Sequence, residues 1–351
     1  MPDLLRVTEH GLYCDAAGGT SAFHIDPWKP VERAVITHAH SDHARPGAAT
    51  YLCAEPSAPL LRLRLGKSIN LTAVPYGQPV SLGDVKISFH PAGHILGSAQ
   101  ARVEHKGEVW TAAGDYKRDP DPTCAPFEPV RCHTFITEST FALPIYRWKP
   151  PAHIFTEINQ WWTDTRALVR TAVIFAYTLG KAQRLLAGVD ASIGPILGHG
   201  ALIEAIDAYA EAGVTLPTVH RATRQSVKDH PGALVIAPPA AAGSAWLDSL
   251  GETSTAYASG WMQVRGRRRW QSADRGFVLS DHADWPALLR TIADTGATRI
   301  LATHGSTAPF VRFLRERGLD ADTLATPYSG ERDAAESDDP PETAAPTVEG
   351  A

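Results

Sequence analysis

His38-Ala39-His40-Ser41-Asp42-His43 is the stretch that decides the fold of this chain. Three imidazoles and one carboxylate fall within six residues, after a short apolar run and before a Pro-Gly turn. Zinc and similar divalent ions take both kinds of ligand. A loop at the end of a strand can direct alternate side chains at one ion, so His38 and His40 can share a metal while Asp42 and His43 face a second position. The motif therefore predicts a metal centre at a strand end rather than a polar surface loop.

Length and composition are those of an ordinary globular protein. The 351 residues leave room for about two domains, and the content is 44% apolar and 20% charged. The four cysteines form no CxxC pair, which argues against a disulfide framework and against a thiolate zinc site. The first residues lack the design of a signal peptide, and no apolar run approaches the roughly 18 residues that span a bilayer. We therefore expect a cytoplasmic protein with no membrane partner.

The net charge of −5 is unevenly distributed. Residues 331–351 carry seven acids and one arginine, a charge of −6, which leaves +1 for the rest of the chain. This tail is rich in Pro and Ala, so we expect it to be disordered. One basic loop is predicted to bind nucleic acid through its phosphates, although a solvated loop is the alternative: Arg265, Arg267, Arg268 and Arg269. The neighbouring Trp261 and Trp270 could stack on unpaired bases or pack in the interior.

The pattern of elements changes along the chain. The first half consists of short strands broken by turns, such as Val85–His90. Helical spacing over Ile154–Arg170 and a strand near Ser192–Ile196 then begin an alternation of helices and strands, which predicts a separate α/β domain. The pattern of strands followed by polar loops then returns, with a strand at Gly276–Ser280 and a helix at about Trp285–Thr295.

Further ligand-type residues stand at the ends of apolar runs. His94 lies between glycines that let a loop approach an ion closely, and Asp115 ends a strand-like run. A carboxylate can bridge two cations, although a turn aspartate is the alternative. Asp26 could orient a metal-bound imidazole or simply form a turn before Pro27.

Three more candidates lie near the predicted domain junctions. Glu138, His282 and His304 each end or follow a strand-like run. Alone, each histidine is more often a structural hydrogen bonder than a ligand. Because all three residues stand at the ends of similar strand-like runs, we expect one rim of a sheet to present them together.

These motifs together resemble the metallo-β-lactamase fold, and the segment between Glu138 and His282 resembles the insert of its β-CASP nuclease branch. In that branch an acidic residue precedes the insert and two histidines follow it, as Glu138, His282 and His304 do here. The resemblance covers about residues 10–330 and implies an α/β protein, a metallo-β-lactamase αββα sandwich with an inserted α/β β-CASP domain. The expected parts are the sandwich at 1–148 and 273–330, the insert at 149–272 and the tail at 331–351.

A narrower resemblance is to the bacterial ligase-associated DNA exonucleases. It rests on Ile25-Asp26-Pro27-Trp28, His40 to Gly47, Gly114 to Arg118, Glu138-Ser139-Thr140-Phe141 and Leu279 to Trp285. The DNA-crosslink-repair relatives usually lack a histidine at the last position, whereas His304 is present here, as in the RNA-processing relatives. This departure predicts a complete second metal site.

The resemblance also implies ligands and roles. One divalent ion would be held by His38, His40, His94 and Asp115. A second would be held by Asp42, His43, Asp115 and His304. Zinc is expected, with manganese as the alternative. A hydroxide that bridges the metals would attack the phosphodiester, His282 would act as general acid with Glu138 as its partner, and Asp26 would support catalysis by orienting a ligand.

The function expected from these features is that of a two-metal DNA exonuclease in DNA repair. Its partner would be DNA that is single-stranded or has ends, with RNA possible, and the family resemblance alone implies association with a DNA ligase and a helicase. A β-CASP ribonuclease has the same metal chemistry and is the first alternative. The insert and the arginine loop argue against a lactonase or thioesterase, and the filled ligand positions argue against a non-catalytic nucleic-acid-binding module. Cleavage polarity, exonuclease or endonuclease mode and oligomeric state do not follow from the sequence.

Overall fold

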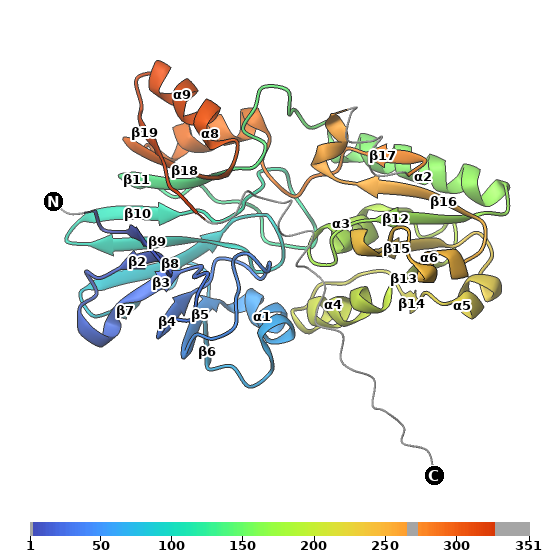
Figure 1. Ribbon diagram of the computed structural model, residues 1–351, viewed down its shortest axis with the longest axis horizontal. Coiled ribbons are helices and arrows are strands. Elements are labelled where there is room, and N and C mark those ends of the chain that lie inside the picture. Colours follow the sequence, from blue (N-terminus) through green and yellow to red (C-terminus); the bar gives the residue numbers. More distant parts are fainter. Residues whose placement is uncertain (1–2, 265–272, 327–351) are drawn as a thin grey trace, which may run out of the picture.

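A computed structural model of the chain describes residues 3–264 and 273–326, and the predicted phosphate-binding arginines Arg265, Arg267, Arg268 and Arg269 lie outside the described residues. Three sheets form a mixed α/β structure, the broad class expected from the sequence. In Figure 1 the first two sheets lie together on the left, and the third lies on the right with its helices.

The first sheet is built entirely from the N-terminal part of the chain. Its strands follow one another in chain order, with β1 to β3 antiparallel and β3 to β6 parallel. They are β1 (Arg6–Thr8), β2 (Gly11–Cys14), β3 (Phe23–Ile25), β4 (Arg33–Val35), β5 (Thr50–Ala54) and β6 (Leu71–Val74). The short 3-10 helices η1 (Gly19–Ser21) and η2 (Glu55–Ser57) lie in its connections.

The second sheet combines strands from both ends of the chain. In spatial order its strands are β19 (Asp320–Thr323), β18 (Arg299–Gly305), β11 (Thr134–Ser139), β10 (Glu108–Ala112), β9 (Ala99–His105), β8 (Val85–Pro91) and β7 (Val80–Leu82). The chain leaves this sheet after β11 and returns to pair β18 parallel to the same strand. Residues far apart in the sequence therefore meet at the ends of β11 and β18.

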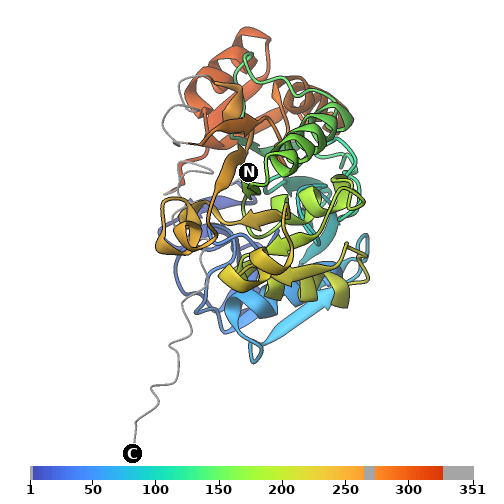
Figure 2. The ribbon, with the colours of Figure 1, turned by 90° about the vertical axis from the view of Figure 1, so that its right-hand side faces the viewer.

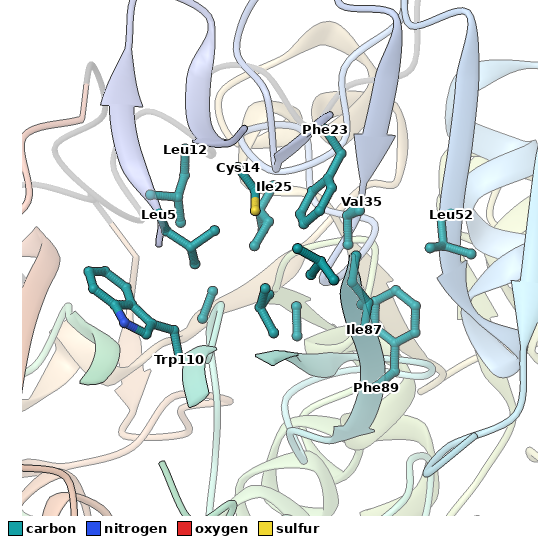
Figure 3. Close-up of a cluster of buried hydrophobic side chains, with 14 of the residues drawn as sticks. Leu5, Leu12, Cys14, Phe23, Ile25, Val35, Leu52, Ile87, Phe89 and Trp110 are labelled. Atoms are coloured by element: carbon teal, nitrogen blue, oxygen red, sulfur yellow. The ribbon is translucent and has the colours of Figure 1, made fainter. Parts of the chain in front are cut away.

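A hydrophobic core fills the space between the first two sheets. On β8 the alternate residues Val85, Ile87 and Phe89 are buried in this core, as the two-residue period of a strand requires. They share this core with Phe23 and Val35 of the first sheet, and Figure 3 shows Ile87 and Phe89 on the opposite side of it from Phe23 and Val35.

Helices cover the outer faces of this pair of sheets. Helix α1 (Ala58–Leu65) buries Leu60 and Leu61 against the first sheet. On the second sheet, α8 (Trp285–Thr295) packs with α9 (Thr307–Glu316). The spacing of Trp285, Leu288 and Ile292 places one apolar stripe of α8 on the sheet.

The third sheet belongs to a separate α/β unit, and all its strand pairs are parallel. Its strands in spatial order are β14 (Val219–Arg221), β13 (Ile196–Gly198), β15 (Leu234–Ala237), β12 (Thr171–Phe175), β16 (Thr253–Ala258) and β17 (Arg275–Phe277). Its helices are α2 (Pro151–Ala167), α3 (Lys181–Gly188), α4 (Gly200–Glu211), α5 (Arg224–Asp229) and α6 (Ala245–Ser249), with η3 (Pro239–Ala241) and η4 (Gly260–Gln263). In Figure 2, which turns this unit toward the viewer, α2 is the long green helix.

Both faces of this sheet are buried. On β12, Ala172 and Ile174 lie in one core with α2, and Val173 and Phe175 lie in a second core with α5. A central parallel strand covered on both sides must be apolar at every position, which explains the continuous apolar run in the sequence.

Two sequence predictions need correction here. The strand predicted near Ser192–Ile196 begins only at Ile196, because residues 190–194 form a turn. The strand predicted at Gly276–Ser280 is β17, and it pairs with β16 in the third sheet rather than with the sandwich. We therefore propose that the insert extends to about residue 279 instead of ending at 272.

Candidate active site

The ligand-type residues stand at neighbouring strand ends. The histidine motif follows β4, His94 follows β8 and Asp115 follows β10. Gly114 has a φ of 57°, and a Cβ there would lie 2.6 Å from Thr37 Oγ1. A larger residue could not bring the loop that carries Asp115 so close to the motif.

The first group of converging side chains contains four predicted ligands. The ligand atoms of His38, His40, His94 and Asp115 lie within 4.8 Å of one another, and all four residues are buried. His94 Nε2 is 3.1 Å from His40 Nδ1, and Asp115 Oδ2 is 3.5 Å from His38 Nε2. The structure thus brings together the residues predicted to hold the first ion.

The second group contains Asp42, His43 and His304, whose ligand atoms meet the same 4.8 Å limit. Asp115 Oδ2 is also 3.5 Å from His43 Nε2. The carboxylate of Asp115 therefore lies between the two groups, as a bridging ligand must.

A β-bulge places His304 in this group. Glu138 pairs with Thr303 and Ser139 with Gly305, so His304 is the extra residue between the two pairs. Its φ is 51°, in the left-handed region that non-glycine residues rarely adopt. Bulges of this kind redirect one side chain, and this one turns the imidazole toward His43.

Asp26 orients a member of the second group without belonging to it. Its Oδ2 accepts a hydrogen bond of 2.8 Å from His43 Nδ1, and its Oδ1 accepts one of 2.8 Å from the backbone N–H of Thr37. The bond fixes the ring of His43 with Nε2 toward Asp42 and Asp115. The structure thus gives Asp26 a positioning contact with His43.

Asp26→Ala is expected to weaken the binding of a divalent ion at the second group by about 10- to 100-fold, because an orienting partner of a ligand typically contributes that much. Zinc competition with a chromophoric chelator measures this. Asp190→Ala is the matched control, since Asp190 bonds the N–H and hydroxyl of Ser192 in the same way, at 2.9 and 2.6 Å, on the exposed surface of the other unit. Equal affinities for Asp26→Ala and the parent protein would contradict the role.

The donor atoms of both groups fit divalent ions. The buried atoms His38 Nε2, His43 Nε2 and Asp42 Oδ1 have no hydrogen-bond partner among the described residues. Buried polar atoms without partners cost free energy, and all three of these belong to the two groups. An imidazole and carboxylate donor set of this kind matches the preferences of zinc and manganese.

The protonation of the first group also suits metal binding. Burial, aided by His43, holds the pKa of His38 well below its usual value. Burial and His282 lower the pKa of His94 to about 3. Burial alone would raise the pKa of Asp115, but His43 and His282 outweigh it and hold that pKa well below normal. Neutral imidazoles and ionised carboxylates are the forms that bind metals.

A cavity of about 50 Å³ lies beside the second group, lined by Asp42, His43 and His304 and by apolar residues such as Trp28. A water needs about 10–15 Å³ of such volume. Solvent can therefore occupy the space next to these ligands.

His282 and Glu138 form a buried pair at the edge of the first group. His282 Nδ1 donates to Glu138 Oε2 at 2.9 Å, and Glu138 Oε1 accepts from the backbone N–H of Tyr116 at 2.8 Å. Burial lowers the pKa of His282, but the carboxylates of Glu138 and Asp115 outweigh burial and raise that pKa to about 10. The ring of His282 lies 4.6 Å from that of His94, so the pair faces the site.

Sequence reasoning missed several residues that shape this site. Trp148 Nε1 donates to the carbonyl of His282 at 2.9 Å. His40 Nε2 lies 3.1 Å from the carbonyl oxygen of Leu179. Backbone carbonyls leave no signature in a sequence, and nothing near Trp148 suggested such a contact. Trp261, considered for base stacking, packs with its ring centroid 4.7 Å from that of Phe141.

The fold and site together define an α/β protein with a buried imidazole and carboxylate centre suited to divalent ions. No protein-family model matches the chain. Among the helices of residues 3–264 and 273–326, none has the length and apolarity that crossing a bilayer requires.

Three curated relatives are similar to parts of the chain. A probable DNA ligase of Opitutus terrae is 34% identical over 318 residues, which cover 89% of this chain and 30% of the relative. An RNase J-like protein of Methanocaldococcus jannaschii is 24% identical over 213 residues, 52% of this chain and 50% of the relative. The endoribonuclease YSH1 of Saccharomyces cerevisiae is 26% identical over 122 residues, 34% of this chain and 15% of the relative. The chain thus spans half or less of each relative.

A solved structure agrees with the fold. A protein of unknown function from Enterococcus faecalis V583 superposes with a TM-score of 0.55 at 12% identity, over 77% of this chain and 74% of that chain. The relatives support the metallo-β-lactamase/β-CASP type of fold predicted from the motifs.

Proposed function

We propose that this chain is a metal-dependent nuclease that hydrolyses phosphodiesters with two divalent ions, for which zinc is the first candidate. We also propose that it acts as a DNA exonuclease in DNA repair. The observation that carries the proposal is the position of Asp115 Oδ2, 3.5 Å from both His38 Nε2 and His43 Nε2. One carboxylate shared by two groups of imidazoles is the arrangement of two-metal phosphoesterases.

The relatives support the nuclease class and leave the choice of nucleic acid to experiment. Similarity to a probable DNA ligase over 89% of this chain favours DNA and a role beside a ligase. Similarity to the RNase J-like protein and YSH1 favours the second candidate, a ribonuclease. The helicase partner remains a prediction from the family resemblance.

Different residues of the site would perform different parts of the reaction. Two bound divalent ions would lower the pKa of a water and neutralise charge on the phosphate. Asp26 and Thr37 hold His43 in its orientation. His282, whose Nδ1 is bonded to Glu138, keeps its Nε2 for donating a proton to the leaving sugar oxygen.

Cleavage is expected to depend on divalent metal and on the type of polynucleotide. End-labelled single-stranded DNA, duplex DNA and RNA of one sequence would be incubated with the purified chain, after chelation and again after addition of zinc or manganese. We expect no products after chelation, restored cleavage with metal, and faster cleavage of DNA than of RNA. The ladder of products reports polarity and mode. Faster cleavage of RNA would favour the ribonuclease, and metal-loaded protein that leaves all three substrates intact would remove the proposal.

A further inference from the structure

Two of the four ligands in the first group are oriented from outside the sandwich. His40 Nε2 faces the carbonyl oxygen of Leu179 at 3.1 Å, and Leu179 belongs to the insert. His94 Nδ1 faces the carbonyl oxygen of Asp281 at 2.9 Å, and Asp281 lies on the return from the insert. A carbonyl only accepts hydrogen bonds, so each ring must carry its proton on the nitrogen that faces the carbonyl. The opposite nitrogens, His40 Nδ1 and His94 Nε2, are thereby left as lone-pair donors 3.1 Å apart.

A buried ion pair joins the two segments that supply these carbonyls. Lys181 is the first residue of α3, directly after the Leu179-Gly180 turn, and its Nζ lies 3.2 Å from Asp281 Oδ1. Both side chains are almost completely inaccessible, at 0% and 2%. The ammonium also lies 4.4 Å from the centre of the Tyr177 ring.

The turn before Lys181 is held tightly against the loop of His94. Gly180 has a φ of 85°, and a Cβ there would lie 2.2 Å from Ile95 Cγ2. The side chain of Gln183 accepts from the N–H of Gly180 at 2.8 Å and donates to the carbonyl of Thr178 at 2.9 Å. The carbonyl of Leu179 therefore has little freedom to move away from His40.

We propose that Lys181 and Asp281 are positioning residues for the first group. The pair fixes the carbonyls that orient His40 and His94, and in this way the insert sets the metal affinity of the sandwich. This inference rests on the metal binding assumed in the proposed function. The ion pair joins the two segments whose carbonyls face His40 and His94. It acts by holding the Leu179 and Asp281 backbones in register with the two rings, and orienting partners of ligands commonly govern affinity in this way.

The test uses the full chain and zinc alone. Lys181→Met leaves a buried carboxylate unpaired and could fail to fold, so the decisive variant is Lys181→Met/Asp281→Asn, which removes both charges. Zinc competition with a chelator is measured in a His304→Ala background, where the second group lacks a ligand. The expected result is zinc binding weaker by about 10- to 100-fold, together with a changed visible spectrum of the cobalt-loaded protein and unchanged circular dichroism.

Two controls separate positioning from general loss of structure. Arg299→Met/Asp3→Asn removes another ion pair, of 2.6 Å, at the far end of β18 and should leave zinc affinity unchanged. In a His40→Ala background, which removes a ligand from the first group, the Lys181/Asp281 double variant should not change the zinc affinity of the second group. An unchanged affinity in the His304→Ala background, or an equal fall in both backgrounds, would overturn the inference.

The outcome is independent of whether the chain cleaves nucleic acid. A protein that binds two zinc ions but cleaves no polynucleotide would remove the proposed function and leave this inference standing. If the parent protein cleaves DNA and the double variant binds zinc as tightly as the parent, this inference is removed and the proposed function stands.

Discussion

Asp115→Ala is expected to lower nuclease activity by at least about a thousandfold. Metal ions in such sites contribute several kcal/mol to catalysis, and about 4 kcal/mol corresponds to that factor. Asp115 Oδ2 is 3.5 Å from one histidine of each group, His38 and His43, so its loss should weaken the binding of both ions at once. The measurements are single-turnover cleavage and the number of zinc ions bound per chain by native mass spectrometry.

The carboxylate should matter for the metals and not for the fold. Without metal, Asp115 is a buried acid surrounded by imidazoles, and its removal leaves the cores of both sheets intact. Asp294→Ala, which removes an acid that is 38% exposed and paired with Arg118, is the control and should keep both ions and full activity. An Asp115→Ala protein that still binds two ions and cleaves at the parent rate would contradict the bridging position.

Local spacing was enough to predict the ligands that stand close together in the sequence. His38, His40, Asp42 and His43 leave one strand end together, so a short loop must bring them near one another whatever the rest of the fold does. His94 and Asp115 follow later strands, and the glycines on both sides of His94 indicated that its loop approaches closely. Their convergence is visible in the structure as the two groups of ligand atoms.

Pairs that depend on the fold could not be predicted from local pattern. Glu138 and His282 are 144 residues apart. The pattern of strand ends predicted that they share a rim, but only the resemblance to the β-CASP branch made them an acid and its partner. Nothing beside Lys181 in the sequence indicates its ion pair, because its partner Asp281 lies on the return from the insert. The prediction for β17 was wrong for a similar reason, because a short apolar run fits either sheet. Only its pairing with β16 shows that it belongs to the third sheet and not to the sandwich. Long-range packing, which no short window contains, selects these contacts.

His282→Ala is expected to lower the rate of DNA cleavage by at least about a hundredfold, the low end for loss of a general acid, while both metal ions remain bound. His282 is not one of the residues predicted to hold the ions, although its ring lies within 4.8 Å of ligand atoms of His94 and Asp115. Its Nδ1 is bonded to Glu138, so only Nε2 is left to protonate a leaving oxygen. Single-turnover cleavage of DNA and the zinc content of the same preparation measure the two quantities.

A substrate with an activated leaving group distinguishes acid catalysis from a structural role. The p-nitrophenolate ion departs without a proton, so a p-nitrophenyl ester of thymidine phosphate should react nearly as fast with His282→Ala as with the parent protein. Glu138→Gln keeps the shape of the orienting side chain but removes its charge, and we expect a smaller loss on DNA and little change on the activated ester. Because a poorly positioned site would slow both substrates, an equal loss on DNA and on the activated ester would show that His282 supports the structure rather than donating the proton.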